Sequence, residues 1–150
     1  MKNIFEESVT KEVIERINQL TNDSQPIWGK MNVGQMLAHC NVMYEMVYDN
    51  IHPKAKGFKK LLLKLFVKPM VVGPAPYKRN LRTAPAFLIT DERDFETEKN
   101  RLIKYLEDTQ ALGGRYFHMK ESNSFGFLTE NEWNVMFYKH IDHHLQQFGV

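Results

Sequence analysis

Residues 129–148 read TENEWNVMFYKHIDHHLQQF and predict the last helix of the chain. Thr129 and Glu132 have the spacing of a capping box, in which each side chain bonds to the other residue's backbone N–H at a helix start. Beyond them, aromatic and histidine residues recur at steps of four and three: Trp133, Phe137, His140, His144 and Phe148. Because this spacing keeps residues on one face of a helix, the two histidines share the predicted buried face with the aromatic residues.

His140 and His144 have the spacing at which one helix offers two imidazoles to a single metal ion. In zinc proteases this spacing belongs to the motif H-E-x-x-H, whose glutamate acts as the general base. Here Ile141 follows His140, so the protease base is absent. A metal site on this helix therefore needs a third ligand from another part of the chain, and the best candidate is His39.

Two further helices are predicted in the first third of the chain. Apolar residues at helical spacing indicate a helix over about residues 9–21, which the polar, proline-containing segment 22–26 ends. Asn32 is a good N-cap for a second helix that runs to about residue 48. His39 lies at the edge of the broad apolar stripe of this second helix, so its ring can point into the core.

The middle of the chain is less regular and leads to a third main helix. Residues 57–67 form a basic amphipathic stretch with helical periodicity, and residues 69–85 follow as a connector rich in proline and glycine. The next main helix starts near residue 91 or 94 and runs to about residue 112, where a glycine pair supplies the stop. Residues 115–128 are predicted to be a loop.

These four main helices indicate an all-α fold. One long crossover between the second and third helices, carrying an extra short helix, is typical of some four-helix bundles, whose interiors often hold metal sites built from several helices. The sequence has no internal repeat, linker or low-complexity tract. We therefore expect residues 1–150 to form a single domain.

The composition is that of an ordinary globular protein. With 43% apolar and 25% charged residues, the chain does not resemble a disordered one. The net charge of +2 gives no reason to expect a nucleic-acid partner. Cys40 is the single cysteine, which rules out an intrachain disulfide. The N-terminus has no apolar signal core and no apolar run approaches the roughly 20 residues of a membrane span, so we expect a cytoplasmic protein.

Three histidines would give a metal site with at least one open coordination position. Structural zinc sites are usually closed by four protein ligands, so a three-histidine site is of the catalytic type. The opposing interpretation is structural: His39 bonds to a backbone carbonyl at the edge of the core, and the terminal histidines lie in a solvated helix end. Spacing alone does not decide, because H-x-x-x-H arises readily by chance. The loop histidines His52 and His118 receive no role.

Four residues near the candidate ligands could take part in such a site. His143 lies about 60° from the first histidine of the pair and could replace the second, although we expect it outside the ligand set. Asp142 is expected in solvent or as an acceptor for an imidazole N–H. Gln35, one turn before the third histidine, is a surface residue or faces the site. Cys40 points away from it and is expected to be a buried core cysteine rather than a nucleophile.

Several segments of the chain resemble a family of DinB-like proteins of unknown function within the DinB/YfiT-like superfamily. The likeness runs through most of the chain. It rests on Trp28-Gly29-Lys30-Met31, Gln35-Met36-Leu37-Ala38-His39-Cys40, Arg82-Thr83-Ala84-Pro85, Asp94-Phe95-Glu96 and the last helix with the segment that leads into it, residues 125–149.

The resemblance implies a four-helix bundle that binds a divalent metal ion, most often nickel or zinc, with iron or manganese as further options. In that superfamily one histidine on the second helix and an H-x-x-x-H pair on the fourth hold the ion, and these positions carry over to His39, His140 and His144. Members are often dimeric, which implies a homodimer here. Some relatives transfer low-molecular-weight thiols, which implies a small-molecule substrate and only weakly a reaction, because fold does not fix function.

Two functions from different classes follow. The first is a metal-dependent transferase of small thiols, or a hydrolase, in which the ion lowers the pKa of a bound thiol or water. The second is a non-catalytic stress-response or binding module in which the metal is structural or absent. The lysines of residues 54–68 support the second, because a basic amphipathic helix can bind an anionic membrane or a partner. More often, however, the apolar side of such a helix packs on its own domain.

Overall fold

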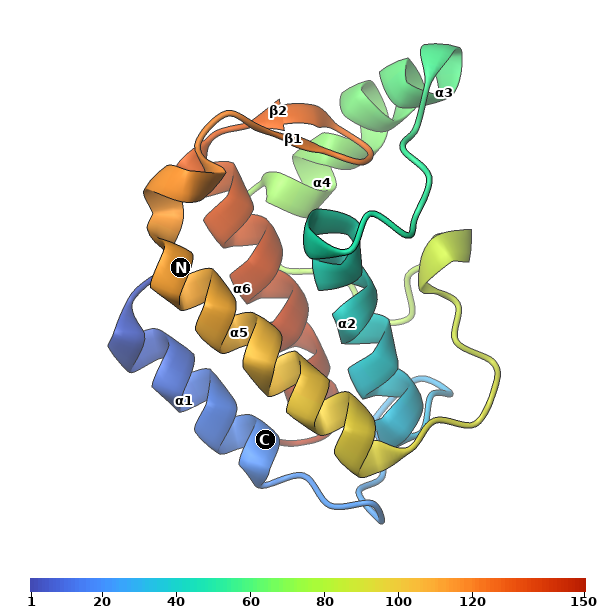
Figure 1. The fold of residues 1–150 in the computed structure, drawn as a ribbon. Helices are drawn as coiled ribbons and strands as arrows, with labels where there is room; N and C mark the ends of the chain where they lie inside the picture. The colour runs from blue at the N-terminus through green and yellow to red at the C-terminus, as the bar shows by residue number, and fades with distance from the viewer.

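Four long helices lie side by side in the structure, a computed structural model that describes residues 1–150. They are α1 (Glu7–Asn18), α2 (Val33–Tyr48), α5 (Phe95–Phe117) and α6 (Glu130–Gln147). Figure 1 shows α5 between α1 and α2 with α6 behind it, and α6 contacts each of the other three. The molecule is mostly helical, as the sequence predicts, apart from one small sheet.

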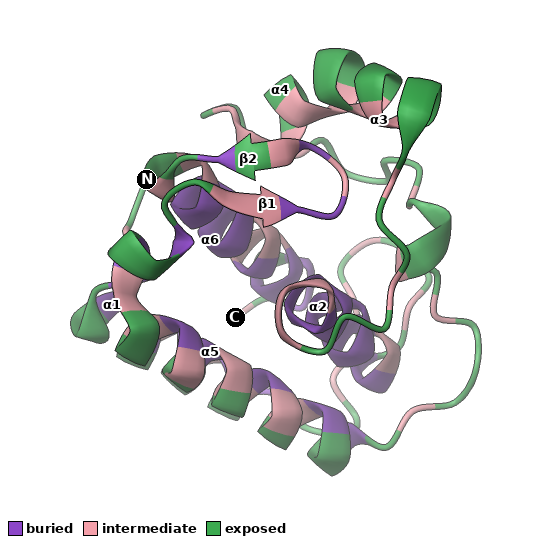
Figure 2. Ribbon diagram, turned by 45° about the horizontal axis from the view of Figure 1, so that its top comes forward, coloured by how far each residue is buried: buried purple, intermediate pink, exposed green.

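A single hydrophobic core joins these helices. Its largest buried side chains are aromatic and include Tyr44 on α2 with Trp133 and Phe137 on α6. The Phe137 ring stacks 5.2 Å from the ring of Tyr44 and 5.3 Å from that of Trp133, and such pairs contribute about 0.5–1.5 kcal/mol each beyond their buried area. Figure 2 shows α2 and α6 buried over most of their surface, whereas α5 exposes its outer side. The two helices that carry the candidate ligands are therefore the central ones.

Capping residues fix the starts of α2 and α6 where the sequence predicts them. Asn32 and Gln35 form a reciprocal capping box at α2, and Thr129 and Glu132 form another at α6. Each box satisfies two backbone N–H groups that have no partner inside the helix. α1 begins two residues earlier than predicted and ends three residues earlier. Its last turn tightens because the N–H groups of residues 19 and 20 bond to carbonyls three residues back.

The predicted stop at the glycine pair is confirmed for the first helical segment of α5, and a short second segment follows the kink at Gly113 and ends at Phe117. Gly113 has φ 70° and ψ 164°, a conformation that glycine alone adopts readily. The next residue, Gly114, packs so tightly against Glu130 that a Cβ there would lie 2.1 Å from the carboxylate. This kink turns the chain inward, and the Phe117 ring stacks 5.3 Å from that of Phe5.

The predicted loop at residues 115–128 is wrong in part, because it contains a hairpin. Strands β1 (Lys120–Ser122) and β2 (Gly126–Leu128) pair antiparallel, with Lys120 opposite Leu128. The hydroxyl of Ser122 holds the turn together, since it accepts from the N–H of Phe125 at 2.9 Å and donates to the carbonyl of residue 126 at 3.0 Å. The hairpin thus leads α5 back into α6.

The crossover between α2 and α5 is helical for longer than predicted. It contains α3 (Gly57–Leu62), a π-helical turn η1 (Leu63–Val67), α4 (Lys68–Val72) and a 3₁₀ turn η2 (Pro85–Phe87). The irregular connector therefore begins after Val72 rather than at Pro69, because proline is tolerated in the first turn of a helix, where its missing N–H is not needed.

The apolar residues of this crossover divide between two sides. Leu63 and Val67 pack against the core, whereas Phe58 and Phe66 are each 73% exposed. The expectation that the apolar side of this stretch packs on its own domain therefore holds only for its inner face. No helix of the structure combines the length and the apolar composition that crossing a bilayer requires.

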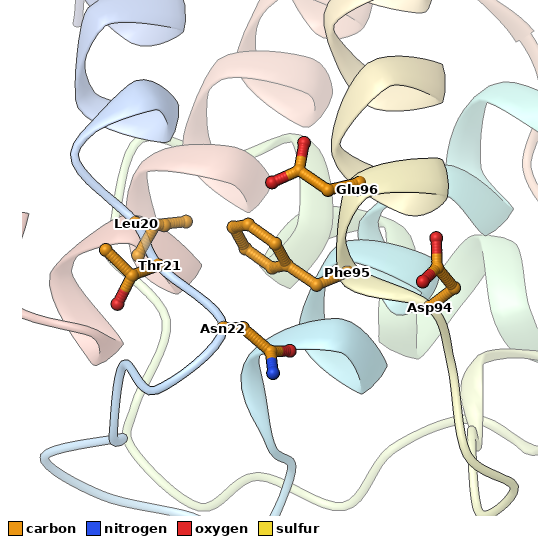
Figure 3. A pocket seen from close by; sticks show the side chains of 6 residues that line it. All are labelled: Leu20, Thr21, Asn22, Asp94, Phe95 and Glu96. Carbon is orange, nitrogen blue, oxygen red and sulfur yellow. The ribbon is translucent and has the colours of Figure 1, made fainter.

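A small hollow of about 310 Å³ lies between the end of α1 and the start of α5, and Figure 3 shows the side chains that line it. They include Thr21, Asn22, Asp94 and Glu96, with Leu20 and Phe95 beneath. It contains no histidine, lysine or arginine, and it shares no residue with the much larger pocket beside the candidate metal ligands.

Candidate metal centre

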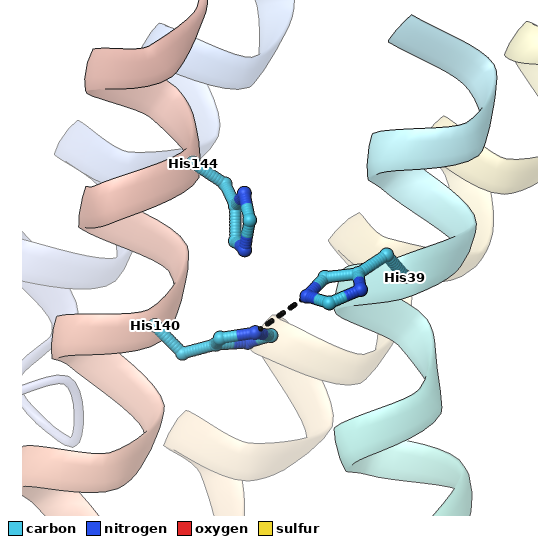
Figure 4. Close-up of side chains that lie close together, drawn as sticks. All are labelled: His39, His140 and His144. Carbon is cyan, nitrogen blue, oxygen red and sulfur yellow. Dashed lines mark hydrogen bonds between the residues drawn. The ribbon is translucent and has the colours of Figure 1, made fainter. Parts of the chain in front are cut away.

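The imidazoles of His39, His140 and His144 converge between α2 and α6, as Figure 4 shows. The Nε2 atoms of His39 and His140 lie 3.0 Å apart, and one ring nitrogen from each histidine lies within 4.8 Å of the other two. The sequence predicts this meeting from three observations: the four-residue spacing on the last helix, the edge position of His39 and the resemblance to the DinB/YfiT-like superfamily. The structure thus brings together residues that are about a hundred positions apart in the chain.

The surroundings of the three rings favour neutral imidazole. Burial, together with a smaller effect of the neighbouring His39 ring, lowers the pKa of His144 to about 3. Burial also holds the pKa of His140 well below its ordinary value and lowers that of His39, although the hydrogen bond to Phe87 raises the latter. At neutral pH each ring therefore keeps a nitrogen lone pair, which is the form that binds a metal ion.

The hydrogen bonds at Nδ1 settle the tautomers of two of the rings. The Nδ1 of His39 lies 2.8 Å from the carbonyl oxygen of Phe87. A carbonyl only accepts, so this Nδ1 carries the hydrogen and the Nε2 of His39 keeps its lone pair. The backbone carbonyl that the structural interpretation expects beside His39 is therefore present, but it bonds to only one of the two ring nitrogens. The other faces the remaining histidines.

Gln147 orients His144 in the same way. The side-chain N–H of Gln147 donates to the carbonyl of Trp28 at 2.7 Å, so its amide oxygen points to the Nδ1 of His144, 2.8 Å away. His144 must then donate from Nδ1 and keep its lone pair on Nε2. Such partners commonly fix the ring orientation of metal-binding histidines. Gly29 allows this approach, because a Cβ there would lie 2.5 Å from the amide nitrogen of Gln147.

The donor set and its spacing fit a divalent ion. Two nitrogens that bind one zinc ion tetrahedrally lie about 3.3 Å apart, given Zn–N distances of about 2.0–2.1 Å. The observed separations range from 3.0 Å for His39 and His140 to at most 4.8 Å, a range that includes this value. Without a metal, His140 donates from Nε2 to His39, and binding an ion requires its proton to move to Nδ1.

Two of the neighbouring residues, His143 and Asp142, take positions outside the ligand set. The ring of His143 lies between those of Trp28 and Tyr77, at 5.8 and 5.6 Å, so it does not replace His144 in the cluster. The carboxylate of Asp142 accepts a hydrogen bond from Arg16 at 2.7 Å and bonds to no imidazole. Of the two positions expected for Asp142, acceptor for an imidazole N–H or surface residue, only the second remains.

The structure also defines the contacts of Gln35 and Cys40. Gln35 completes the cap of α2, donates to the carbonyl of Asp91 at 3.2 Å and lines the large pocket. Cys40 is buried with its sulfur 3.8 Å from that of Met36, and burial raises the pKa of its thiol. Cys40 therefore behaves as the core residue that the sequence predicts, not as a nucleophile.

Sequence reasoning missed two groups that support the cluster, Gln147 and the carbonyl of Phe87. The position of Gln147, three residues after His144, places it on the same face of the helix and offers a signal for it. The carbonyl of Phe87 offers no signal, because it reaches His39 from an irregular part of the crossover. Sequence reasoning also missed His52, whose Nε2 donates to the buried carboxylate of Glu45 at 2.7 Å, far from the cluster.

The cluster lies in the wall of a pocket of about 810 Å³ between α2, α6 and the crossover. This volume is within the range of about 300–1,000 Å³ that holds small-molecule ligands in proteins. His39, His140 and His144 all line it, and so do Trp28, Tyr77 and other aromatic and apolar residues. A metal ion held by the three imidazoles would thus have its open position toward a space large enough for a substrate.

The comparisons with known proteins give one clear result. No curated protein and no solved structure matches the chain. A family model does match, described as a protein of unknown function (DUF1569), and the match covers residues 5–149. Because that range takes in almost the whole chain, with all three converging histidines, the protein belongs to the DUF1569 family.

Proposed function

We propose that the protein is a divalent-metal enzyme in which His39, His140 and His144 hold the ion. The observation that carries this proposal is the common direction of the ring nitrogens: Phe87 and Gln147 occupy the Nδ1 atoms of two rings and leave their Nε2 lone pairs facing the third. Core histidines with a purely structural role have no need for such convergence. The resemblance to the DinB/YfiT-like superfamily supports the same ligands and nickel or zinc as the ion.

The reaction that we propose is transfer of a small thiol to an electrophilic carbon. When bound, the ion would supply Lewis acidity that lowers the pKa of a thiol or water molecule. The thiol then loses its proton to solvent, its sulfur forms a bond to the carbon, and the leaving group departs with the bonding electrons. No aspartate or glutamate lines the pocket, so its residues offer no carboxylate base, and activation by an ion fits the site better.

The residues of the pocket provide the rest of what such a reaction needs. The Phe87 ring packs against those of His39 and His140, and Trp28 and Tyr77 pack against the neighbouring His143, so aromatic rings reduce the access of water to one side of the site. Gln147 and the carbonyl of Phe87 hold two rings in place. The proposal extends to the cytoplasm as location, on the strength of the sequence, and to a homodimer as assembly, which the resemblance to the DinB/YfiT-like superfamily implies.

Metal analysis of protein purified without a histidine tag tests the site. We expect about one nickel or zinc ion per chain, and less than a tenth of that in His144→Ala. His118→Ala is the matched control, because His118 is exposed and lies outside the cluster. Equal metal content in the two variants would disprove the site. A thiol-transfer screen then tests the reaction. Wild-type turnover by metal-free His144→Ala would show that the ion is not the catalyst.

The exposed side of the crossover favours a second candidate function, a module that binds anionic membrane surfaces. Phe58, Leu61, Leu65 and Phe66 are each at least half exposed on α3 and η1, and lysines flank them. Basic amphipathic helices with this pattern lie in membrane interfaces. Co-sedimentation with phosphatidylglycerol vesicles that weakens with salt and is lost in Phe66→Ser would favour this function. Absence of binding at low salt would exclude it.

A further inference from the structure

The wall of the large pocket is apolar where α2 and the crossover meet. Its members are flexible or branched aliphatic side chains from both segments: Met43, Met46, Val47, Leu63, Val67 and Met70. Methionine side chains are adaptable and fill irregular space, so a wall rich in them accommodates a flexible aliphatic ligand. The pocket therefore provides a surface that a purely polar substrate would leave unused.

The charged side chains that line the pocket are all positive. Lys30, Lys78 and Arg82 line it, and no aspartate or glutamate does. None of these three cations forms an ion pair within the protein, whereas Lys60 on α3 and Lys68 on α4 each pair with a glutamate. In a chain with 20 basic and 18 acidic residues, such a concentration is unusual. Residues 50–90, which form the crossover, contain seven lysines, two arginines and no acidic residue.

The cations and the histidines lie at different depths. Lys30, Lys78 and Arg82 are exposed, whereas His39 and His144 are buried. An anionic group bound by the cations would therefore stay at the solvent side of the pocket. The apolar part of the same molecule would extend along the methionines and bring a reacting group to the histidines.

We propose that the pocket binds an aliphatic molecule with one anionic group, of the class of a medium-chain carboxylate. The proposal rests on the combination of an apolar wall with unpaired cations in one pocket. An inorganic anion would leave the apolar wall uncovered, and a neutral hydrocarbon would leave the cations without a partner. A cationic amphiphile would meet repulsion from all three. As a statement about substrate, the inference rests on the proposed metal enzyme. As a statement about binding, it is testable in metal-free protein.

Titration calorimetry of metal-free protein with three ten-carbon probes tests the proposal. The probes are decanoate, decanol and decyltrimethylammonium, each used below its micelle concentration. We expect decanoate to bind most tightly and decyltrimethylammonium most weakly. The double variant K78Q/R82Q should weaken decanoate about 3- to 10-fold and leave decanol unchanged, as expected for the loss of two solvent-exposed charge interactions.

Two further variants serve as controls. One removes charge outside the pocket, and the other tests whether the probes bind inside it. K56Q/K59Q removes two exposed lysines of the same crossover that do not line the pocket, and it should bind decanoate as the wild type does. Met46→Trp fills the pocket from a half-buried position on α2 and should weaken both decanoate and decanol. Equal weakening by the two charge variants, equal affinity for anion and cation, or no binding of any probe would overturn the proposal.

The same titration separates this inference from the metal site. Metal-free and metal-loaded wild-type protein should bind decanoate with equal affinity, because the anion contacts the cations rather than an ion. If decanoate binds only to metal-loaded protein, and K78Q/R82Q leaves that binding unchanged, the carboxylate lies on the metal. The assignment of the cations would then be wrong, while the metal site would stand.

Discussion

The side-chain nitrogen of Lys139 on α6 lies 2.6 Å from the carbonyl oxygen of Gly73, directly after α4. It also donates to the carbonyls of Met70 and Ala75, and it lies 4.6 Å from the centre of the Tyr77 ring. The last carbonyls of a helix have no partner inside it, and a cation there also interacts well with the helix dipole. Lys139 therefore attaches the crossover to the helix that carries two of the candidate ligands.

Replacement of Lys139 by methionine should release this attachment. Because the variant loses three hydrogen bonds from a charged donor that is 5% exposed, we expect the free energy of unfolding to fall by about 1–3 kcal/mol. Amide hydrogen exchange should accelerate at residues 68–77. Lys104→Met is the control, since Lys104 forms only an exposed pair with Asp108 and should change stability by less than about 0.5 kcal/mol. Equal effects of the two substitutions would contradict the role of Lys139.

Removal of metal should lower stability without unfolding the helices. The aromatic and aliphatic core does not depend on the cluster, so the chain has its own source of folding energy, unlike a zinc finger. A bound ion present at about a thousand times its dissociation constant adds roughly 4 kcal/mol. Chelator should therefore reduce the melting temperature and leave the helical circular dichroism at room temperature intact. Loss of that helical signal would show that the metal is required for folding.

Replacement of Gln147 by leucine should weaken metal binding although Gln147 is not a ligand. The variant loses the acceptor that fixes the tautomer of His144, and changes of this kind typically cost about 10–100-fold in metal affinity. Gln146→Leu is the matched control, because Gln146 is the exposed neighbour and bonds to Asp142. Competition with a chromogenic chelator gives both affinities. A wild-type affinity in Gln147→Leu would mean that the hydrogen bond does not orient the ring.

Glu45 should make stability depend on pH in the acidic range. Burial raises the pKa of Glu45, but hydrogen bonds from His52 and Arg101 outweigh it and leave the pKa below its ordinary value of 4.5. A carboxyl with a lowered folded-state pKa contributes stability above the unfolded value and loses it as the pH falls through the folded value. The stability that Glu45 adds should therefore be complete above pH 4.5 and decline below it.

Urea unfolding at several pH values checks this prediction. Glu45→Gln should be less stable than the wild type at pH 7, and the difference should shrink as the pH falls below 4.5. Glu15→Gln serves as control, because Glu15 is exposed and forms no ion pair, so its small effect should not follow the same course. A constant difference between wild type and Glu45→Gln at all pH values would contradict the assignment.

The sequence predicts the parts of this fold that depend on local rules. The N-cap at Asn32, the capping box at Thr129 and the helical spacing of apolar residues locate α2 and α6, and with them the three histidines. Local rules fail where tertiary packing decides. The glycine pair interrupts α5 at Gly113 as predicted, but the sequence does not predict the short second segment that ends at the buried Phe117. The strands of the hairpin are three residues each, too short for alternation to reveal them.

The candidate site likewise has parts that follow from local rules and parts that depend on tertiary packing. His140 and His144 follow from spacing, and His39 follows from its place on an apolar stripe. The groups that orient them come from backbone and from an amide, and a carbonyl such as that of Phe87 exists at every position of the chain. Which carbonyl is used depends on the path of the crossover, and that path is set by contacts such as those of Lys139.

The distance in sequence between the candidate ligands has a consequence for chain topology. His39 and His140 are 101 residues apart, so an ion bound to both would close a loop that contains the crossover, α5 and the hairpin. With a single cysteine, the chain has no disulfide to act as a cross-link. A covalent link that closes a loop of this length restricts the unfolded ensemble by an entropy equivalent to about 4–5 kcal/mol, whereas an ion that leaves on unfolding stabilises the protein only by binding the folded chain. The ion would thus join the two central helices only while it is bound, and the concentration of metal would set how readily the segment between them unfolds.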